Sequence, residues 1–417
     1  MKQNTQSLFS GIDKYHLIIF ACCWLGGIFD GMDSSLMTVA LPSAIGELTG
    51  KVDKETISQF GSYVSAIFLT GWMLGGVVFG FIGDKFGRVK SMIFSILLYA
   101  IFTGLAGLAQ SWEQLAVCRF LTGLGIGGEL VSIATFLSEV WPERSRAIAI
   151  GVLITSYQAG VFLAGAINLF FSNWRTVFFI GAIPALLVIV LRLTLKESEK
   201  WMQDQKMHSH TEEQKTPLKE ILNRENAKNL IIGSLAFGGL LVGYWASLSW
   251  IPTWVQSLLT TPGNQERSIV TIYQGLAAII GCSTAGFLFD SIGRKKTLLI
   301  SFVGCFASSA LLFLSNKTFS QTIYFETALL GYFIGLAQAA MYIYLPELFK
   351  TRVRASGVGL CLNSGRFLTI IAVLFIGPLV GFLGGYGQAA FAFSFSYVFG
   401  ILASLICTET KGQSLPD

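Results

Sequence analysis

Five ionisable side chains occur inside stretches of the sequence that are otherwise almost entirely apolar. A charge at the centre of a bilayer costs roughly 3 kcal/mol on insertion scales, so ionisable residues at such positions usually belong to ion or substrate pathways. Hydropathy alone does not account for these five residues. They are therefore the first candidates for chemistry: Asp30, Asp33, Arg119, Glu129 and Arg366.

The two aspartates lie one helical turn apart and therefore on one face of a helix. Two carboxylates at this spacing ionise together poorly, so at least one of them can take up and release a proton. Glu129, which follows the glycine-rich segment GLGIGG, is another candidate proton site. Arg119 is expected to pair with Asp33. The alternatives are a static Asp–Arg pair that joins two helices and a Glu129 with a purely structural hydrogen bond.

Arg366 is the candidate for binding a substrate carboxylate, because its planar guanidinium can donate two parallel hydrogen bonds. The alternative is that Arg366 pairs with Glu326 or extends to the membrane surface. The internal repeat described below places Gln158 opposite Arg366. Polar and aromatic side chains on several apolar runs could complete a cavity, and the candidates are Tyr157, Gln158, Tyr244, Trp245, Tyr273, Gln274, Gln338, Tyr342 and Asn363.

These residues are carried by apolar runs long enough to cross about 30 Å of hydrocarbon. Only 13% of the 417 residues are charged and 53% are hydrophobic, which is typical of a polytopic membrane protein rather than a soluble domain. We therefore predict an all-α membrane protein with twelve transmembrane helices. The runs are 17–40, 59–82, 91–109, 115–139, 148–171, 175–195, 230–256, 268–289, 297–315, 321–345, 355–381 and 386–407.

The 29 lysines and arginines are distributed unevenly between the two sides of the membrane. Most are expected on the side that also holds both ends of the chain, and those expected on the other side are Lys51, Lys54, Arg175, Arg267 and Lys317. This distribution predicts a bacterial inner-membrane protein with both termini in the cytoplasm. The net charge of +5 is therefore an orientation signal and predicts no nucleic-acid partner. The seven cysteines show no metal-ligand spacing, so no metal or cofactor is expected.

Two motifs of the first half of the chain recur in equivalent loops of the second half. GFIGDKFGRVK at 80–90 matches GFLFDSIGRKK at 286–296, and SEVWPERSRA at 138–147 matches PELFKTRVRA at 346–355. Two halves of the same topology are therefore predicted, related by an axis along the membrane normal. We expect a six-helix bundle in residues 1–195, a cytoplasmic linker in 196–229 and a second six-helix bundle in 230–417.

The segments GDKFGRVK and FDSIGRKK resemble the loop 2–3 signature of the major facilitator superfamily, and the resemblance extends over essentially the whole chain. It implies two pseudo-symmetric six-helix bundles that rock about a central site. It also implies a cytoplasmic gate of charged residues that is made and broken during this motion. The residues that match this gate are Asp84, Arg88, Glu139, Arg144, Arg146, Asp290, Arg294, Glu347, Arg352 and Arg354.

Further segments resemble the proton-coupled organic-acid symporters, a grouping that includes the sialate, aromatic-acid and metabolite–proton families. These segments are RFLTGLGIGGEL, SEVWPERSRAIAIG, NWRTVFFIGAIPALL, DGMD and ESEKW. The segments PELFKTRVRASG and TETKG resemble the sugar porters as well, so they do not discriminate between the two groupings.

The sequence therefore predicts a transporter and not an enzyme. It would import a small organic carboxylate with one or more protons by alternating access, as a monomer in the lipid bilayer. Arg366 would bind the anion, and Asp30, Asp33 and Glu129 would carry the proton. A sugar or polyol symporter of the same fold is the nearest alternative. An exporter or exchanger of metabolites is the second, and a membrane sensor that does not transport is the third.

Overall fold

The computed structural model describes residues 12–142, 145–184, 186, 190–191, 194–197, 202, 223–350 and 354–411. Within these ranges every regular element is a helix and no strand occurs. Ten of the described segments are long and apolar enough to cross a membrane. Residues 115–139, which carry Arg119 and Glu129, are helical but are not among the ten, and the predicted run 175–195 is described only in part. The predicted all-helical, multi-pass class is confirmed.

The first group of helices runs from residue 14 to residue 180. Several of them start where a side chain accepts a backbone hydrogen bond, as Asp53 does from the N–H of Thr56 at 2.8 Å. α2 packs against α4, α1 against α5, and α3 against both α4 and α6. The helices of this group are α1 (Lys14–Thr49), α2 (Lys54–Phe86), α3 (Arg88–Ala106), α4 (Trp112–Val140), α5 (Arg146–Phe170) and α6 (Trp174–Ile180).

The second group contains helices that are interrupted within a single apolar run. Ser247, which has φ −124° and ψ −70°, ends α10 before a short 3-10 helix begins. In this group α12 packs against α14, α10 against α15, and α13 against α18. The elements are α10 (Arg224–Ala246), η1 (Leu248–Trp250), α11 (Ile251–Leu258), α12 (Asn264–Ile292), α13 (Arg294–Ser315), α14 (Thr322–Glu347), α15 (Arg354–Leu374), α16 (Ile376–Leu383), α17 (Tyr386–Ser394) and α18 (Ser396–Ile406).

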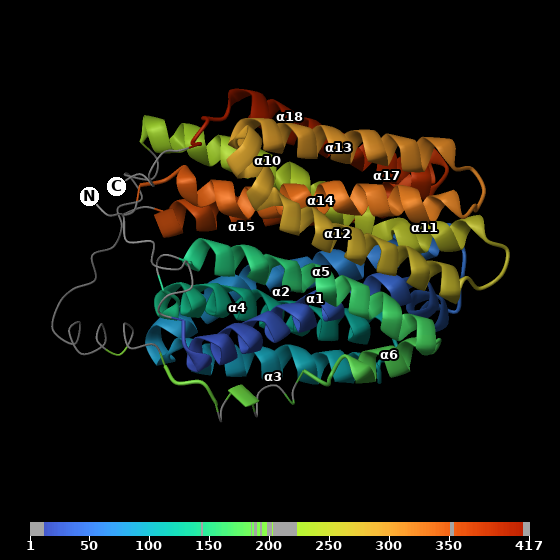
Figure 1. Ribbon diagram of the computed structural model, residues 1–417. Coiled ribbons are helices and arrows are strands. Elements are labelled where there is room, and N and C mark those ends of the chain that lie inside the picture. Colours follow the sequence, from blue (N-terminus) through green and yellow to red (C-terminus); the bar gives the residue numbers. More distant parts are fainter. Residues whose placement is uncertain are drawn as a thin grey trace, which may run out of the picture.

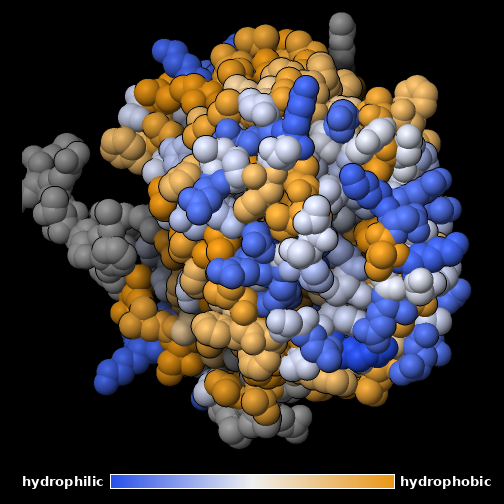
Figure 2. All heavy atoms as spheres, turned by 90° about the vertical axis from the view of Figure 1, so that its right-hand side faces the viewer, coloured by the Kyte–Doolittle hydropathy of each residue, from blue (hydrophilic) through white to orange (hydrophobic). Residues whose placement is uncertain are grey.

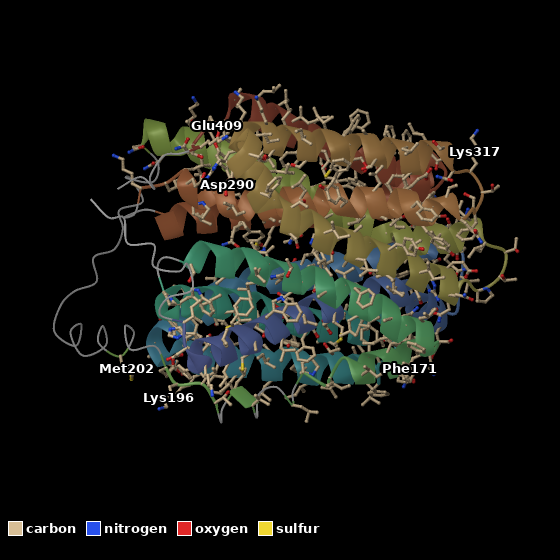
Figure 3. The ribbon with its side chains drawn as sticks, in the orientation of Figure 1. Phe171, Lys196, Met202, Asp290, Lys317 and Glu409 are labelled. Atoms are coloured by element: carbon tan, nitrogen blue, oxygen red, sulfur yellow. The ribbon has the colours of Figure 1, made fainter. Side chains whose placement is uncertain are left out.

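The two groups lie side by side with their helices roughly parallel, the first below and the second above in Figure 1. Lys196, Asp290 and Glu409 mark one end of the helices, which we call the terminal face, and Phe171 and Lys317 mark the other end, the distal face (Figure 3). Contacts between the groups involve α5 with α12, α2 with α15 and α16, and α1 with α11. These contacts leave room for a cavity between the groups, described below.

Seen from the distal face, hydrophilic side chains gather on the end of the molecule and hydrophobic ones form much of its rim (Figure 2). Large apolar side chains are exposed along the sides of the helices, and the most exposed include Phe81, Phe170, Phe287 and Phe382. Such exposure is unfavourable in water but favourable in hydrocarbon. The protein is therefore an integral membrane protein whose helix sides contact lipid.

Candidate functional site

A cavity of about 150 Å³ lies between the two groups of helices. Side chains of α1, α2, α4 and α5 line it from one group, and those of α10, α14 and α15 line it from the other. Most of the lining is aliphatic or aromatic. The polar and ionisable side chains that reach it come from both helix groups and include Asp30, Ser156, Tyr157, Tyr244, Gln338, Tyr342, Arg366 and Thr369.

Arg366 brings a positive charge from α15 into this cavity. Its Nη1 donates to Oδ1 of Asn363 at 3.3 Å, and its Cζ lies 5.8 Å from the ring centre of Trp72 in the opposite helix group. No acidic side chain pairs with Arg366 in the described part of the chain. Glu326, the alternative partner, instead accepts a hydrogen bond from Asn316. The guanidinium is therefore available to a bound anion.

Aromatic rings from the two groups meet at the cavity. The ring centres of Trp72 and Trp245 are 5.8 Å apart, and those of Tyr157 and Tyr244 are 6.3 Å apart. Trp72 also lies 6.2 Å from Tyr157, so the four rings form one cluster. Tyr157 is among the predicted site residues, whereas Trp72 is not. A tryptophan in an apolar run gives no sequence signal that separates a cavity wall from a packed core.

Asp30 is the only acid among the lining residues. Its side chain is 1% exposed, and neither carboxyl oxygen has a hydrogen-bond partner among the described residues. Glu129 does not line the cavity. It is fully buried, its carboxyl likewise has no hydrogen-bond partner among the described residues, and it interacts electrostatically with the carboxyl of Asp30. Gly26, one turn before Asp30, lacks a side chain where Glu129 approaches, and a Cβ there would collide with Oε1 of Glu129. Two buried carboxyls without donors or cations are stable when they hold protons.

Asp33 has very different surroundings, although it lies on the same helix one turn away. Arg119 binds its carboxylate through two nitrogens, Nη1 to Oδ1 at 3.3 Å and Nη2 to Oδ2 at 3.0 Å. Thr103 donates a further hydrogen bond to Oδ1. The guanidinium of Arg119 also lies 4.6 Å from the ring centre of Phe68. The structure thus contains the expected Asp33–Arg119 pair, and this pair is fully buried.

The remaining polar candidates lie at three different places. Nε2 of Gln158 donates to Oε1 of Gln338 at 2.6 Å, which connects α5 with α14, and only Gln338 lines the cavity. Gln274 lines a second hollow, of about 10 Å³, together with hydroxyl groups of α1 that include Thr38. Asn363 does not line the cavity but accepts the hydrogen bond from Arg366.

The charged residues assigned to the cytoplasmic gate form ion pairs at the terminal face. Arg88 contacts Glu139 at 3.1 Å, and Arg294 contacts Glu347 at 2.9 Å, each pair within one helix group. Asp290, whose side chain is 86% exposed, lies 3.8 Å from Arg294. Five other residues of this set fall outside the description: Arg144 and Arg352 entirely, and Asp84, Arg146 and Arg354 in their side chains.

Two glutamates that carry no predicted role occupy equivalent positions at this face. Oε2 and Oε1 of Glu197 accept hydrogen bonds from the backbone N–H groups of Val89 and Lys90, at the start of α3, both at 3.1 Å. Glu409 does the same at the start of α13, accepting from the N–H of Arg294 at 2.9 Å and of Lys295 at 3.1 Å. A negative charge is favourable there because the first N–H groups of a helix have no partner within it.

Glycines make both contacts possible. Gly87 has φ 109° and Gly293 has φ 93°, values that residues with a side chain rarely adopt. A Cβ at either position would also meet the capping glutamate, at 2.5 Å from Glu197 and 2.7 Å from Glu409. The repeated glycine of the two loop motifs therefore serves both the turn and the approach of the carboxylate.

At the distal face, polar side chains connect the two helix groups. The amide nitrogen of Asn168 donates to Oδ1 of Asn264 and to Oγ of Ser268, both at 2.9 Å. Arg267 donates to the carbonyl of Val39 at 3.1 Å and to Oγ of Ser43 at 3.2 Å. Arg267 is only 3% exposed. Its place in the sequence indicated a loop charge, but the residue lies in α12 between the groups.

The sequence of this chain is similar to those of known proteins. The model of the Major Facilitator Superfamily matches residues 23–373. The chain is 28% identical over 415 residues to a "Probable 4-methylmuconolactone transporter" of Cupriavidus pinatubonensis, covering 95% of this chain and 92% of the relative. It is 27% identical over 406 residues to the "Cis,cis-muconate transport protein" of Acinetobacter baylyi, covering 94% and 95%.

Among solved structures, a D-xylose-proton symporter superposes with a TM-score of 0.77 and 18% identity, covering 96% of this chain and 100% of that one. This likeness shows the fold, in which twelve helices form two six-helix bundles. The family and the relatives named above are transporters and not enzymes. The chain is thus a membrane transporter and belongs to the Major Facilitator Superfamily.

Proposed function

We propose that this protein imports a small organic carboxylate together with protons by alternating access. The proposal rests mainly on Arg366, a partly buried guanidinium in the central cavity with no acidic partner in the described part of the chain. A partly buried cation without a counter-ion is costly, and a substrate carboxylate would reduce that cost through two parallel hydrogen bonds.

The volume and the aromatic lining of the cavity favour a flat substrate of about one ring. The volume of about 150 Å³ matches that of an engineered apolar cavity that binds benzene, also about 150 Å³. The rings of Trp72, Tyr157 and Trp245 offer faces for stacking, and Arg366 would hold the acidic end. The names of the two relatives support this choice, since muconate is an unsaturated carboxylate and methylmuconolactone derives from such an acid.

Asp30 and Glu129 are proposed to carry the proton. Asp30 lines the same cavity as Arg366, so arrival of an anion at Arg366 alters the electrostatic environment of Asp30. A proton on the buried acid pair would neutralise charge while the loaded carrier reorients, and an unaccompanied ion in low dielectric would oppose that step. The Asp33–Arg119 pair, held by three side-chain hydrogen bonds, is proposed to couple α1 to α4.

The terminal face is proposed to be cytoplasmic, because the sequence predicts most of the lysines and arginines on the side of the membrane that holds both ends of the chain. The halves 1–195 and 230–417 would then rock about the cavity, joined by the linker 196–229. The ion pairs Arg88–Glu139 and Arg294–Glu347 would serve the cytoplasmic gate within their own halves. The distal hydrogen bonds between the groups would close the outer side.

Counterflow in proteoliposomes with labelled cis,cis-muconate and labelled benzoate tests the carboxylate site. The substitution Arg366→Gln is expected to raise the half-saturating concentration about 100-fold, since losing a charged partner in a buried site costs roughly 3 kcal/mol. Arg366→Lys keeps the charge but not the two parallel donors, so its loss should be intermediate. Lys317→Gln, at the exposed distal end, is the matched control for removal of a positive charge.

The alternatives give different results in the same assay. A sugar symporter should exchange labelled D-xylose and should keep its affinity in Arg366→Gln. An exporter or exchanger should transport the carboxylate without responding to an imposed pH gradient. Either outcome would refute the proposed function.

A further inference from the structure

Tyr99 of α3 has a buried hydroxyl group that no hydrogen bond accounts for. Its side chain is fully buried, and the phenolic oxygen has no hydrogen-bond partner among the described residues. Buried tyrosine hydroxyls normally find a partner, because leaving a buried donor unpaired costs free energy. No residue of α3 lines the central cavity, so Tyr99 does not contact a substrate there.

The hydroxyl of Tyr99 faces the two acids that also lack partners. It interacts with the carboxyl of Glu129 and, at longer range, with Asp30. The position is fixed by the packing of α3 on α4, where a Cβ on Gly125 would lie 2.8 Å from Cβ of Tyr99. Gly125 lies one turn before Glu129, so this close contact holds the tyrosine beside the acid. Three side chains from three helices thus meet, each with a polar group that makes no hydrogen bond to another described residue.

The other ionisable groups around this cluster do not replace Tyr99 as a donor. Arg119 of α4 is already bound to Asp33. The carboxylate of Asp33 also interacts electrostatically with Tyr99. From α1, Cys23 faces Glu129, and from α5, Tyr157 faces Asp30. Among the described residues of α2 and α6, no ionisable side chain interacts with Glu129. When Glu129 loses its proton, a protonated Asp30 and Tyr99 are the two neighbours that can donate a hydrogen bond to it without leaving another partner.

We infer that Tyr99 is a positioning residue of the proton site, whose hydroxyl stabilises the ionised form of Glu129 and thereby sets how tightly the Asp30–Glu129 pair holds a proton. The inference rests on the proposed proton coupling and adds a residue that does not touch the substrate. In the protonated state of the pair the tyrosine is not required as a donor. In the ionised state its hydroxyl donates a hydrogen bond that favours proton release in a buried site.

The test is an infrared titration of the purified full-length protein in proteoliposomes, which reads the C=O band of protonated carboxyls and needs no substrate. In the wild type, a band that Asp30→Asn and Glu129→Gln each diminish should disappear as the pH rises. In Tyr99→Phe the midpoint of this loss is expected to move up by about one pH unit, because the anion has lost the hydrogen bond from the tyrosine hydroxyl. Tyr99→Met, a second variant without the hydroxyl, should behave in the same way.

The matched control is Tyr397→Phe, which removes another fully buried hydroxyl without a partner among the described residues, in the other helix group. Its titration should coincide with that of the wild type. Coincidence of Tyr99→Phe with the wild type would overturn the role of Tyr99 while leaving proton coupling in place. A wild-type protein with no titrating buried carboxyl would instead overturn the proposed proton coupling itself. In a protein that already carries Glu129→Gln, adding Tyr99→Phe must cause no further shift of the midpoint.

Discussion

Asp30 and Asp33 lie one helical turn apart but have different surroundings. Asp33 is held by Arg119 and Thr103, and its carboxylate is fully buried. Asp30 lines the cavity, and its carboxyl makes no hydrogen bond to any described residue. A group that changes protonation during transport must be reachable and must not be locked in one charge state. By this criterion Asp30 is the proposed proton carrier, whereas Asp33 is part of a fixed ion pair.

The substitution Asp30→Asn separates proton coupling from substrate binding. Asparagine resembles the protonated acid in size and charge, so substrate exchange should persist while uptake driven by an imposed pH gradient is lost. Both quantities are measured in proteoliposomes with labelled cis,cis-muconate. Asp33→Asn is the contrasting variant: it leaves Arg119 buried without its counter-ion, which should lower the free energy of unfolding by about 3–5 kcal/mol. Unchanged driven uptake in Asp30→Asn would remove Asp30 from the proton pathway.

At the scale of helices, capping by Glu197 and Glu409 explains why the two loop motifs repeat. Each glutamate reaches the start of a helix from a segment more than a hundred residues away in the sequence. For Glu409, burial would raise the pKa, but hydrogen bonds from the N–H groups of Arg294, Lys295 and Lys411 outweigh it and lower the pKa below its ordinary value of 4.5. The ionised glutamate therefore stabilises the folded state.

The sign of this effect defines its pH dependence. Because the pKa of Glu409 is lowered on folding, its contribution is present above pH 4.5 and is lost as the pH falls through the lower, folded value. Glu409→Gln should lower the stability at pH 7 by about 0.5–1 kcal/mol, and the difference from the wild type should shrink below pH 4.5. Thermal unfolding of the purified protein in detergent measures both. Asp290→Asn, which removes an exposed acid at the same face, is the control. A difference that grows on acidification would contradict the capping role.

The helices themselves were largely predictable, because the length of an apolar run is a local property of the sequence. The interruptions at Ser247 and Phe375 were not, since both lie inside runs that are apolar throughout. The pairing of Arg119 with Asp33 was predictable because both are charged residues at similar depths within their apolar runs. The contact of Trp72 with Arg366 was not, because it joins α2 to α15 through side chains that hydropathy cannot distinguish from packing residues.

For the whole molecule, the polar contacts between the groups are concentrated toward one end. The described hydrogen bonds that cross between the groups lie at the distal face, apart from the Gln158–Gln338 bond in the middle. At the terminal face, the described ion pairs Arg88–Glu139 and Arg294–Glu347 each stay within one group. The described contacts therefore hold the two groups together mainly at the distal side, and the proposed alternating access would require those bonds to break.

Asn168 is the residue whose loss should weaken this closure most simply, because its amide donates to both Asn264 and Ser268. Two hydrogen bonds of about 1 kcal/mol each correspond to a shift of about 30-fold toward states open at the distal face. The shift can be read from the rate at which a membrane-impermeant maleimide, added from the distal side, labels Thr38→Cys. Thr38 lines the small hollow beneath these bonds and is not itself part of them.

Asn168→Ala should therefore speed labelling of Thr38→Cys by about one order of magnitude or more, as the populations shift. The matched control is Asn316→Ala, since Asn316 also lies toward the distal face but its hydrogen bonds to described residues go to Leu312, Ser320 and Glu326, all in its own group. It should leave the labelling rate unchanged. Equal rates in the two variants would mean that the contacts of Asn168 do not hold the halves closed, and that closure depends instead on the apolar packing of α5 against α12.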